Sequence, residues 1–145
     1  MLTSGSAGLS AILGGMAPED GAAAADDVSA VDYTGSQGAG KDLKRTATVN
    51  GDQWQFNTGH GFDRVHTGPG GVQTDLRTTG LSADQIEQGI AGDVYDYMGN
   101  GGSIPRPGPA GPYQGSLNVG GYNVGYRVVQ TPDGVYRVPT YWLNP

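Results

Sequence analysis

Residues 82–102 constrain the fold most, because they carry the signals of one amphipathic α-helix. Ser82 is a typical N-cap residue, and Gln85, three positions later, completes the spacing of a capping box. A run of Gly and Asn from Gly99 onward is typical of a helix end. We therefore expect a helix that begins after Ser82, ends near Gly99 and buries one face. That face is an apolar stripe with a residue every four positions: Ile86, Ile90, Val94 and Met98.

Short β-strands are expected on both sides of this helix. The segments 46–49 and 53–56 flank an Asn50-Gly51 pair, which tolerates the positive φ of a tight hairpin. After a proline-rich connector at residues 103–112, three further segments have strand character and are separated by glycine-containing turns: 113–119, 122–130 and 135–142. The sequence predicts an α+β fold, with one main helix packed on an antiparallel β meander and a flexible N-terminal segment.

The N-terminal part of the chain has a different composition. Residues 1–40 are rich in Gly, Ala and Ser and contain five acidic residues and no basic one. Such a segment buries too little apolar surface to offset the entropy of ordering it. We expect two parts: an acidic Gly/Ala-rich linker or entry-related segment at residues 1–45, and a catalytic domain at residues 46–145. A short helix around 9–13 or 21–31 is an alternative, although the apolar pattern there is irregular.

Charge and composition exclude some functions and leave others open. The net charge is −6 at pH 7, but residues 41–145 hold eight Lys and Arg against nine acids. This part is therefore close to neutral and can concentrate positive charge in one cleft, so RNA binding stays possible. The absence of cysteine excludes disulfides, thiolate nucleophiles and cysteine-based zinc sites. No run of 18 apolar residues occurs, so we expect no stable membrane insertion.

The two histidines are the strongest candidates for chemistry. His60 and His66 lie in the segment GHGFDRVH, with Arg64 between them. An ordinary imidazole has a pKa of about 6.5 and exchanges protons near neutrality. Two imidazoles and an arginine that holds a phosphate suffice to cleave RNA without a metal: one takes the 2′-hydroxyl proton, and the other protonates the leaving 5′-oxygen. The alternative, that both are ordinary loop histidines, is about equally open. A metal site has less support, because only Asp63 accompanies them and no HExxH spacing occurs.

Several segments together resemble a known class of proteins. They are GHGFDRVH, the helix start LSADQIEQGI, the connector NGGSIPRPGPAGPYQG and the C-terminal LNVGGYNVGYRVVQTPDGVYRVPTYWLNP. This arrangement resembles the C-terminal toxin domains of bacterial polymorphic and contact-dependent inhibition systems. More narrowly, it is similar to the metal-independent ribonucleases grouped as barnase–EndoU–colicin–RelE. The resemblance covers about residues 46–145.

The resemblance implies an endoribonuclease toxin without a cofactor, secreted as part of a larger effector and acting on tRNA or another RNA in the target-cell cytoplasm. It also implies an immunity protein that neutralises the toxin in the producing cell. His60 and His66 would be base and acid, Arg64 or Arg77 would bind phosphate, and Thr140 and Tyr141 would position substrate. We further expect substrate binding at three residues: Arg106, Arg127 and Tyr126.

Two other functions remain open. An ADP-ribosyltransferase-type toxin needs a catalytic glutamate, and only Glu19 and Glu87 are available. A non-catalytic secreted binding module needs only small β-strands and a glycine-rich composition. The three hypotheses differ in whether the protein damages RNA, modifies another target or does neither.

Overall fold

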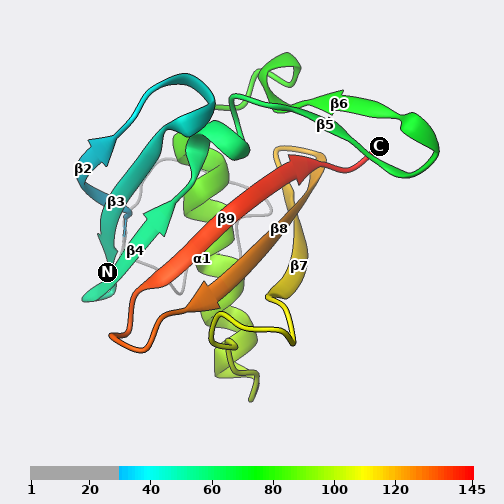
Figure 1. The fold of residues 1–145 in the computed structure, drawn as a ribbon. Helices are drawn as coiled ribbons and strands as arrows, with labels where there is room; N and C mark the ends of the chain where they lie inside the picture. Colours follow the sequence, from blue (N-terminus) through cyan, green and yellow to red (C-terminus); the bar gives the residue numbers. More distant parts are fainter. Residues whose placement is uncertain (1–29) are drawn as a thin grey trace, which may run out of the picture.

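A computed structural model describes residues 30–145, which form a six-stranded sheet with one helix packed against one face (Figure 1). The strand order is β2-β3-β4-β9-β8-β7, and a separate hairpin is formed by β5 and β6. The sheet strands are β2 (Asp32–Gln37), β3 (Lys44–Val49), β4 (Asp52–Phe56), β7 (Tyr113–Val119), β8 (Tyr122–Gln130) and β9 (Tyr136–Leu143). The hairpin strands are β5 (Val65–Thr67) and β6 (Gln73–Asp75), and the helix is α1 (Ala83–Gly99).

Helix α1 begins and ends where the sequence predicts. The Ser82 hydroxyl accepts a hydrogen bond from the backbone N–H of Gln85 at 3.1 Å, and the Ser82 N–H donates to Oε1 of Gln85 at 2.9 Å. This reciprocal pair is the predicted capping box. Ile86, Ile90 and Val94 of the predicted stripe are fully buried. Helix packing on the sheet therefore follows directly from the spacing of apolar residues.

The predicted strands are present, and one unpredicted pairing joins them. β3 and β4 form a hairpin through Asn50 and Gly51, whose φ angles are 52° and 83°. β7, β8 and β9 form the predicted antiparallel meander. β4 and β9 pair in parallel and so unite the hairpin and the meander in one sheet. The α+β class is confirmed, with a sheet that is mostly antiparallel.

The ordered sheet begins earlier than the sequence indicates. β2 pairs with β3 from Asp32 opposite Thr48 to Gln37 opposite Lys44. β2 and the first two residues of β3 lie upstream of the predicted boundary between residues 45 and 46, so the interpretation of residues 32–45 as part of a linker is corrected. Backbone pairing along the sheet edge and the packing of Tyr33 on the core order a segment whose composition alone indicates a linker. The helix considered at 9–13, and nearly all of that at 21–31, lies outside the described residues.

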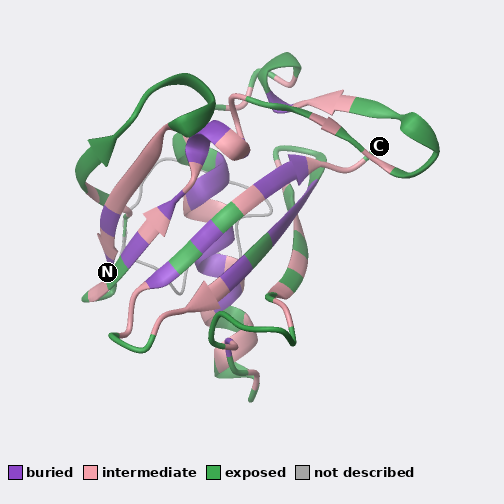
Figure 2. Cartoon of the chain, in the orientation of Figure 1, coloured by how far each residue is buried: buried purple, intermediate pink, exposed green. Residues whose placement is uncertain are grey.

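The two faces of the sheet have different surroundings. Alternate residues of each strand point toward α1 and form the core, in which the Trp54 ring stacks on Phe56 and Tyr136. Residues that alternate with them lie on the opposite face, where Figure 2 shows exposed and half-buried positions along β8 and β9. We call this the open face. In residues 30–145, no helix has the length and apolar character needed to cross a membrane.

Candidate functional site

The open face is basic. Strand alternation and register place Lys44 of β3, Arg127 of β8 and Arg137 of β9 on this face. The side chains that β3, β4, β9, β8 and β7 direct to it include no aspartate or glutamate. A chain with a net charge of −6 thus presents a positively charged sheet face. Such a face attracts anions through local field rather than through the charge of the whole protein.

His66 reaches this face from the β5–β6 hairpin. Its ring stacks on the indole of Trp142, with ring centroids 5.2 Å apart and planes inclined by 20°. The guanidinium carbon of Arg127 lies 5.3 Å from the Trp142 ring centroid. The indole lies against Gly125, where a Cβ atom would be only 2.6 Å from it. Thr74 Oγ1 also donates to the carbonyl oxygen of Leu143, and this bond holds the hairpin against β9.

His60 reaches the same region from the loop that follows β4. It ends a short 3₁₀ helix, η3 (Thr58–His60), and its carbonyl oxygen accepts a hydrogen bond from Thr140 Oγ1 at 3.0 Å. Nη1 of Arg64 lies 3.4 Å from Nδ1 of His60. Thr140 faces Arg127 in the register of β8 and β9, so this loop lies beside the His66 group. Thr140 therefore acts by fixing the His60 loop.

The electrostatic environment favours neutral His66. Partial burial lowers the pKa of His66 below its ordinary value, and the positive charges of Arg64 and Arg127 lower it further. A neutral imidazole is the form that accepts a proton, so His66 is suited to general-base chemistry at neutral pH. Arg64 acts on both histidines, by its contact with His60 and its charge near His66. The resulting group, which we call the His–Arg cluster, is His60, Arg64, His66, Arg127, Thr140 and Trp142.

Two predicted site residues are buried on the helix side and are corrected. Tyr141 is 1% exposed, and its hydroxyl donates to Oε2 of Glu87 at 2.6 Å. Tyr126 is fully buried, and its hydroxyl donates to Oδ2 of Asp93 at 2.6 Å. An irregularity in the β8–β9 register between Arg127 and Val129 shifts the alternation in β9. Neither tyrosine is placed to contact a substrate.

Two predicted arginines lie outside the cluster. Arg77 forms two hydrogen bonds of 2.9 Å with the carboxylate of Asp75, which satisfies its guanidinium in a fork-like pair. Arg106 is exposed in the connector between two prolines and makes no hydrogen bond or ion pair with the other described residues. The structure therefore brings together His60, His66, Arg64, Arg127 and Thr140 of the predicted set, but not these two arginines.

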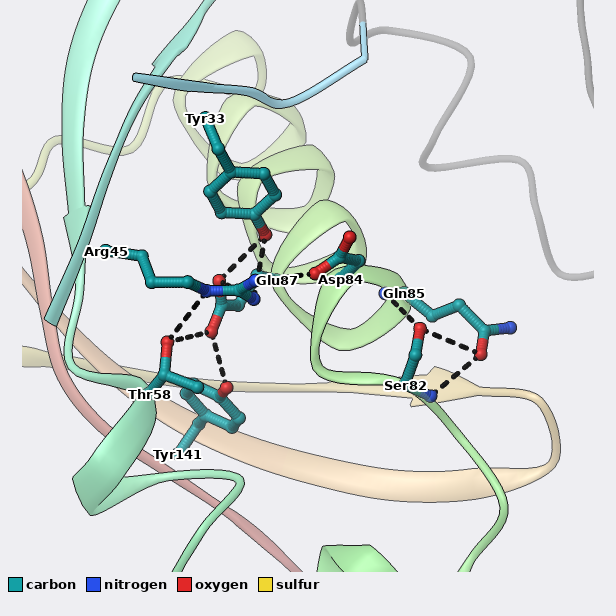
Figure 3. A network of polar contacts seen from close by, with 8 residues as sticks. All are labelled: Tyr33, Arg45, Thr58, Ser82, Asp84, Gln85, Glu87 and Tyr141. Atoms are coloured by element: carbon teal, nitrogen blue, oxygen red, sulfur yellow. Dashed lines mark hydrogen bonds and ion pairs between the residues drawn. The ribbon is translucent and has the colours of Figure 1, made fainter. Parts of the chain in front are cut away.

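A buried carboxylate that the sequence interpretation did not place in the site holds the His60 loop (Figure 3). Glu87 is fully buried and forms an ion pair of 2.8 Å with Nη2 of Arg45. Hydroxyl groups donate to it from three elements, at 2.8 Å from Tyr33, 2.7 Å from Thr58 and 2.6 Å from Tyr141. A fully buried glutamate is stable only when its charge is compensated in this way.

This Glu87 network continues to the His–Arg cluster. Thr58 is the first residue of η3, and His60 is the last, so the bond from Thr58 to Glu87 fixes the short helix that carries His60. Gly61 packs on the ring of Tyr141, where a Cβ atom would be 2.5 Å from the ring. One sequence signal was available: Glu87 directly follows Ile86 and lies three residues before Ile90, next to the buried stripe.

No family model, curated protein or solved structure matches this chain. In residues 30–145, no group of three or more His, Cys, Asp or Glu side chains has the geometry of a metal site. The assignment of the site therefore depends on its own geometry and charge.

Proposed function

We propose that this chain is an endoribonuclease that cleaves RNA on the open face by transesterification. The observation that carries the proposal is the convergence of both histidines with Arg64 and Arg127 beside the part of the open face to which β3, β4, β9, β8 and β7 direct no carboxylate, Asp32 lying apart on edge strand β2. A phosphodiester is an anion, and cleavage needs a base, an acid and a positive group near the phosphorus. The His–Arg cluster contains all three.

The proposed chemistry gives each group of the cluster one role. Neutral His66 takes the proton of the ribose 2′-hydroxyl, and the 2′-oxygen forms a bond to phosphorus. The bond from phosphorus to the 5′-oxygen breaks, and His60 gives the leaving oxygen a proton. The products are a 2′,3′-cyclic phosphate and a 5′-hydroxyl. Arg64 and Arg127 stabilise the negative charge that builds on the phosphoryl oxygens in the transition state.

The biological setting is part of the same proposal and is supported by the resemblance to polymorphic toxin domains. The protein acts as a secreted toxin, its RNA target is tRNA or another cytosolic RNA, and an immunity protein neutralises it. A partner with an acidic surface complements the basic open face. Such a partner covers the His–Arg cluster and blocks access of RNA.

Inducible cytosolic expression tests the proposal. Total RNA from cells that express the wild type, His60→Ala or His66→Ala is separated on a denaturing gel. We expect growth arrest and discrete tRNA or rRNA fragments with the wild type, and loss of the fragments in either variant when all three proteins accumulate equally. Growth arrest with intact RNA contradicts the proposal and favours another toxic enzyme. Absence of arrest favours a binding module.

A further inference from the structure

A pocket beside the His–Arg cluster carries polar groups that the cleavage chemistry does not use. It lies on the open face where β4 and β9 run side by side (Figure 1), and its volume is about 230 Å³. Val129 and Pro139 contribute apolar walls. Its polar lining consists of two cationic and two amide side chains: Lys44, Arg137, Gln55 and Asn57.

The two cations of the pocket favour an anionic ligand. Arg137 donates from Nε to Oε1 of Gln55 at 3.1 Å, which orients the guanidinium and leaves its terminal N–H groups for a ligand. Lys44 lines the same pocket, and no carboxylate lies among the lining residues. Phosphate oxygens are suited to this pair, because an oriented guanidinium and an ammonium both donate to them.

Asn57 adds a requirement for a hydrogen-bond donor. Its side-chain oxygen Oδ1 is buried and has no hydrogen-bond partner among residues 30–145. Buried acceptors in folded proteins are nearly always paired, with protein, water or a ligand. Because Oδ1 is buried, a ligand in the pocket pairs with it only once the Asn57 side chain has turned toward the pocket, and such a ligand brings both an anionic group for the cations and an N–H or O–H group for Asn57. A nucleotide has both.

The pocket adjoins the cluster along two chain segments. Asn57 immediately precedes η3, which ends in His60, and Pro139 immediately precedes Thr140, which binds the His60 carbonyl oxygen. Along β8, Val129 of the pocket lies two residues from Arg127 of the cluster, or roughly 6.6 Å at the usual strand rise. The pocket is thus positioned for the next nucleotide of an RNA bound at the cluster.

We propose that this pocket binds the next nucleotide of the RNA, one position beyond the two nucleosides that flank the scissile phosphate. The phosphate of that nucleotide contacts Lys44 and Arg137, and its ribose hydroxyl or base amino group donates to Asn57. This binding site depends on the proposed ribonuclease function. It extends that function to an RNA substrate that contacts the protein at two phosphates, the scissile phosphate and the next one.

Kinetics on substrates of two lengths test the inference. One substrate is a dinucleoside monophosphate, which contains only the scissile phosphate, and the others are trinucleotides extended by one nucleotide at either end. For Lys44→Gln, Arg137→Gln and Asn57→Ala, we expect kcat/KM to fall about tenfold on one trinucleotide and to stay constant on the dinucleotide. Asn57→Ala removes no cap hydrogen bond, because Asn57 makes none at η3. Lys41→Gln is the control, since it removes one positive charge from an exposed position outside the pocket.

The possible outcomes test the nucleotide pocket and the ribonuclease function separately. The proposed role of the pocket is supported if the wild type cleaves RNA and kcat/KM of the three variants falls only on an extended substrate. Two results overturn the proposed role of the pocket and leave the ribonuclease function intact. In the first, the wild type cleaves RNA and the three variants behave like Lys41→Gln on every substrate. In the second, kcat/KM of the variants falls as much on the dinucleotide as on the trinucleotides. No cleavage of any RNA by the wild type overturns the proposed function itself. Trinucleotides with a 2′-deoxyribose or a base without an amino group then identify the donor to Asn57.

Discussion

The hydroxyl of Tyr141 lies 2.6 Å from Oε2 of Glu87, on the opposite side of the sheet from Trp142, its neighbour in the chain. Two consecutive residues of β9 therefore serve two different sites. Trp142 stacks on His66 on the open face, whereas Tyr141 completes the hydrogen bonding of a buried carboxylate. Burial and the nearby charge of Glu87 raise the pKa of Tyr141 well above its ordinary value, so its hydroxyl stays a donor.

Tyr141→Phe tests this division of roles. The change deletes one hydroxyl and leaves Glu87 with one donor fewer, so we expect the free energy of unfolding to fall by about 1.5–3 kcal/mol, the range for a hydrogen bond to a charged group. Urea unfolding measures the loss. Under the proposed function, we expect the folded variant to cleave RNA like the wild type, because Tyr141 does not contact the open face. An unchanged stability with lost cleavage would instead show that the hydroxyl contacts the substrate.

Arg45→Met is expected to destabilise the protein more strongly. It removes the cation paired with fully buried Glu87 and leaves an uncompensated charge in the core. Breaking a buried ion pair in this way costs about 3–5 kcal/mol, and we expect the lower end of that range because the Arg45 side chain stays 20% exposed. The double variant Arg45→Met with Glu87→Leu removes both charges and recovers part of the loss. A single variant as stable as the wild type contradicts the role of this pair.

Gly61→Ala is expected to disturb the His60 loop. A Cβ atom at this position would be 2.5 Å from the Tyr141 ring, so the loop or the ring must move. We expect a loss of about 1–3 kcal/mol, as for other overpacked positions, and reduced cleavage. Gly68→Ala is the matched control, because its Cβ atom meets its nearest neighbour at an ordinary 3.6 Å and φ is −95°. Equal stability and activity of the two variants would contradict tight packing at Gly61.

Arg127→Gln is expected to raise the pKa of His66. The positive charge of Arg127 disfavours the imidazolium form, so its removal stabilises protonation. NMR titration of the His66 ring protons measures the shift. If His66 is the general base, the rise of activity with increasing pH moves to higher pH by the same amount, because the base is active only when deprotonated. An unchanged or lower pKa contradicts the placement of Arg127 beside His66.

Local sequence signals predicted much of the fold. The capping box at Ser82 and the stripe from Ile86 to Val94 defined α1, and the Asn50-Gly51 pair defined the first hairpin. The parallel pairing of β4 with β9 could not be predicted in this way, because it joins segments about 80 residues apart. β2 was missed because its order comes from edge pairing and one anchoring tyrosine, Tyr33, rather than from apolar periodicity.

The site could be predicted from the sequence where its residues lie close together in one short segment. The proximity of His60, Arg64 and His66 follows from their spacing, and the outward position of Arg127 follows from strand alternation. The position of Tyr141 did not follow, since the register irregularity in β9 changes which face a residue occupies. The role of Glu87 depends on donors from four separate segments, which only the folded chain brings together.

Cleavage of a defined RNA by the purified protein tests the central proposal most directly. Wild type, His60→Ala and His66→Ala, each shown to be folded by circular dichroism, are incubated with tRNA and with a DNA strand of matching sequence. The proposed function predicts tRNA fragments that end in a 2′,3′-cyclic phosphate for the wild type, strong loss of cleavage in both variants, and intact DNA. Intact tRNA with the wild type, or equal cleavage by all three proteins, would contradict it.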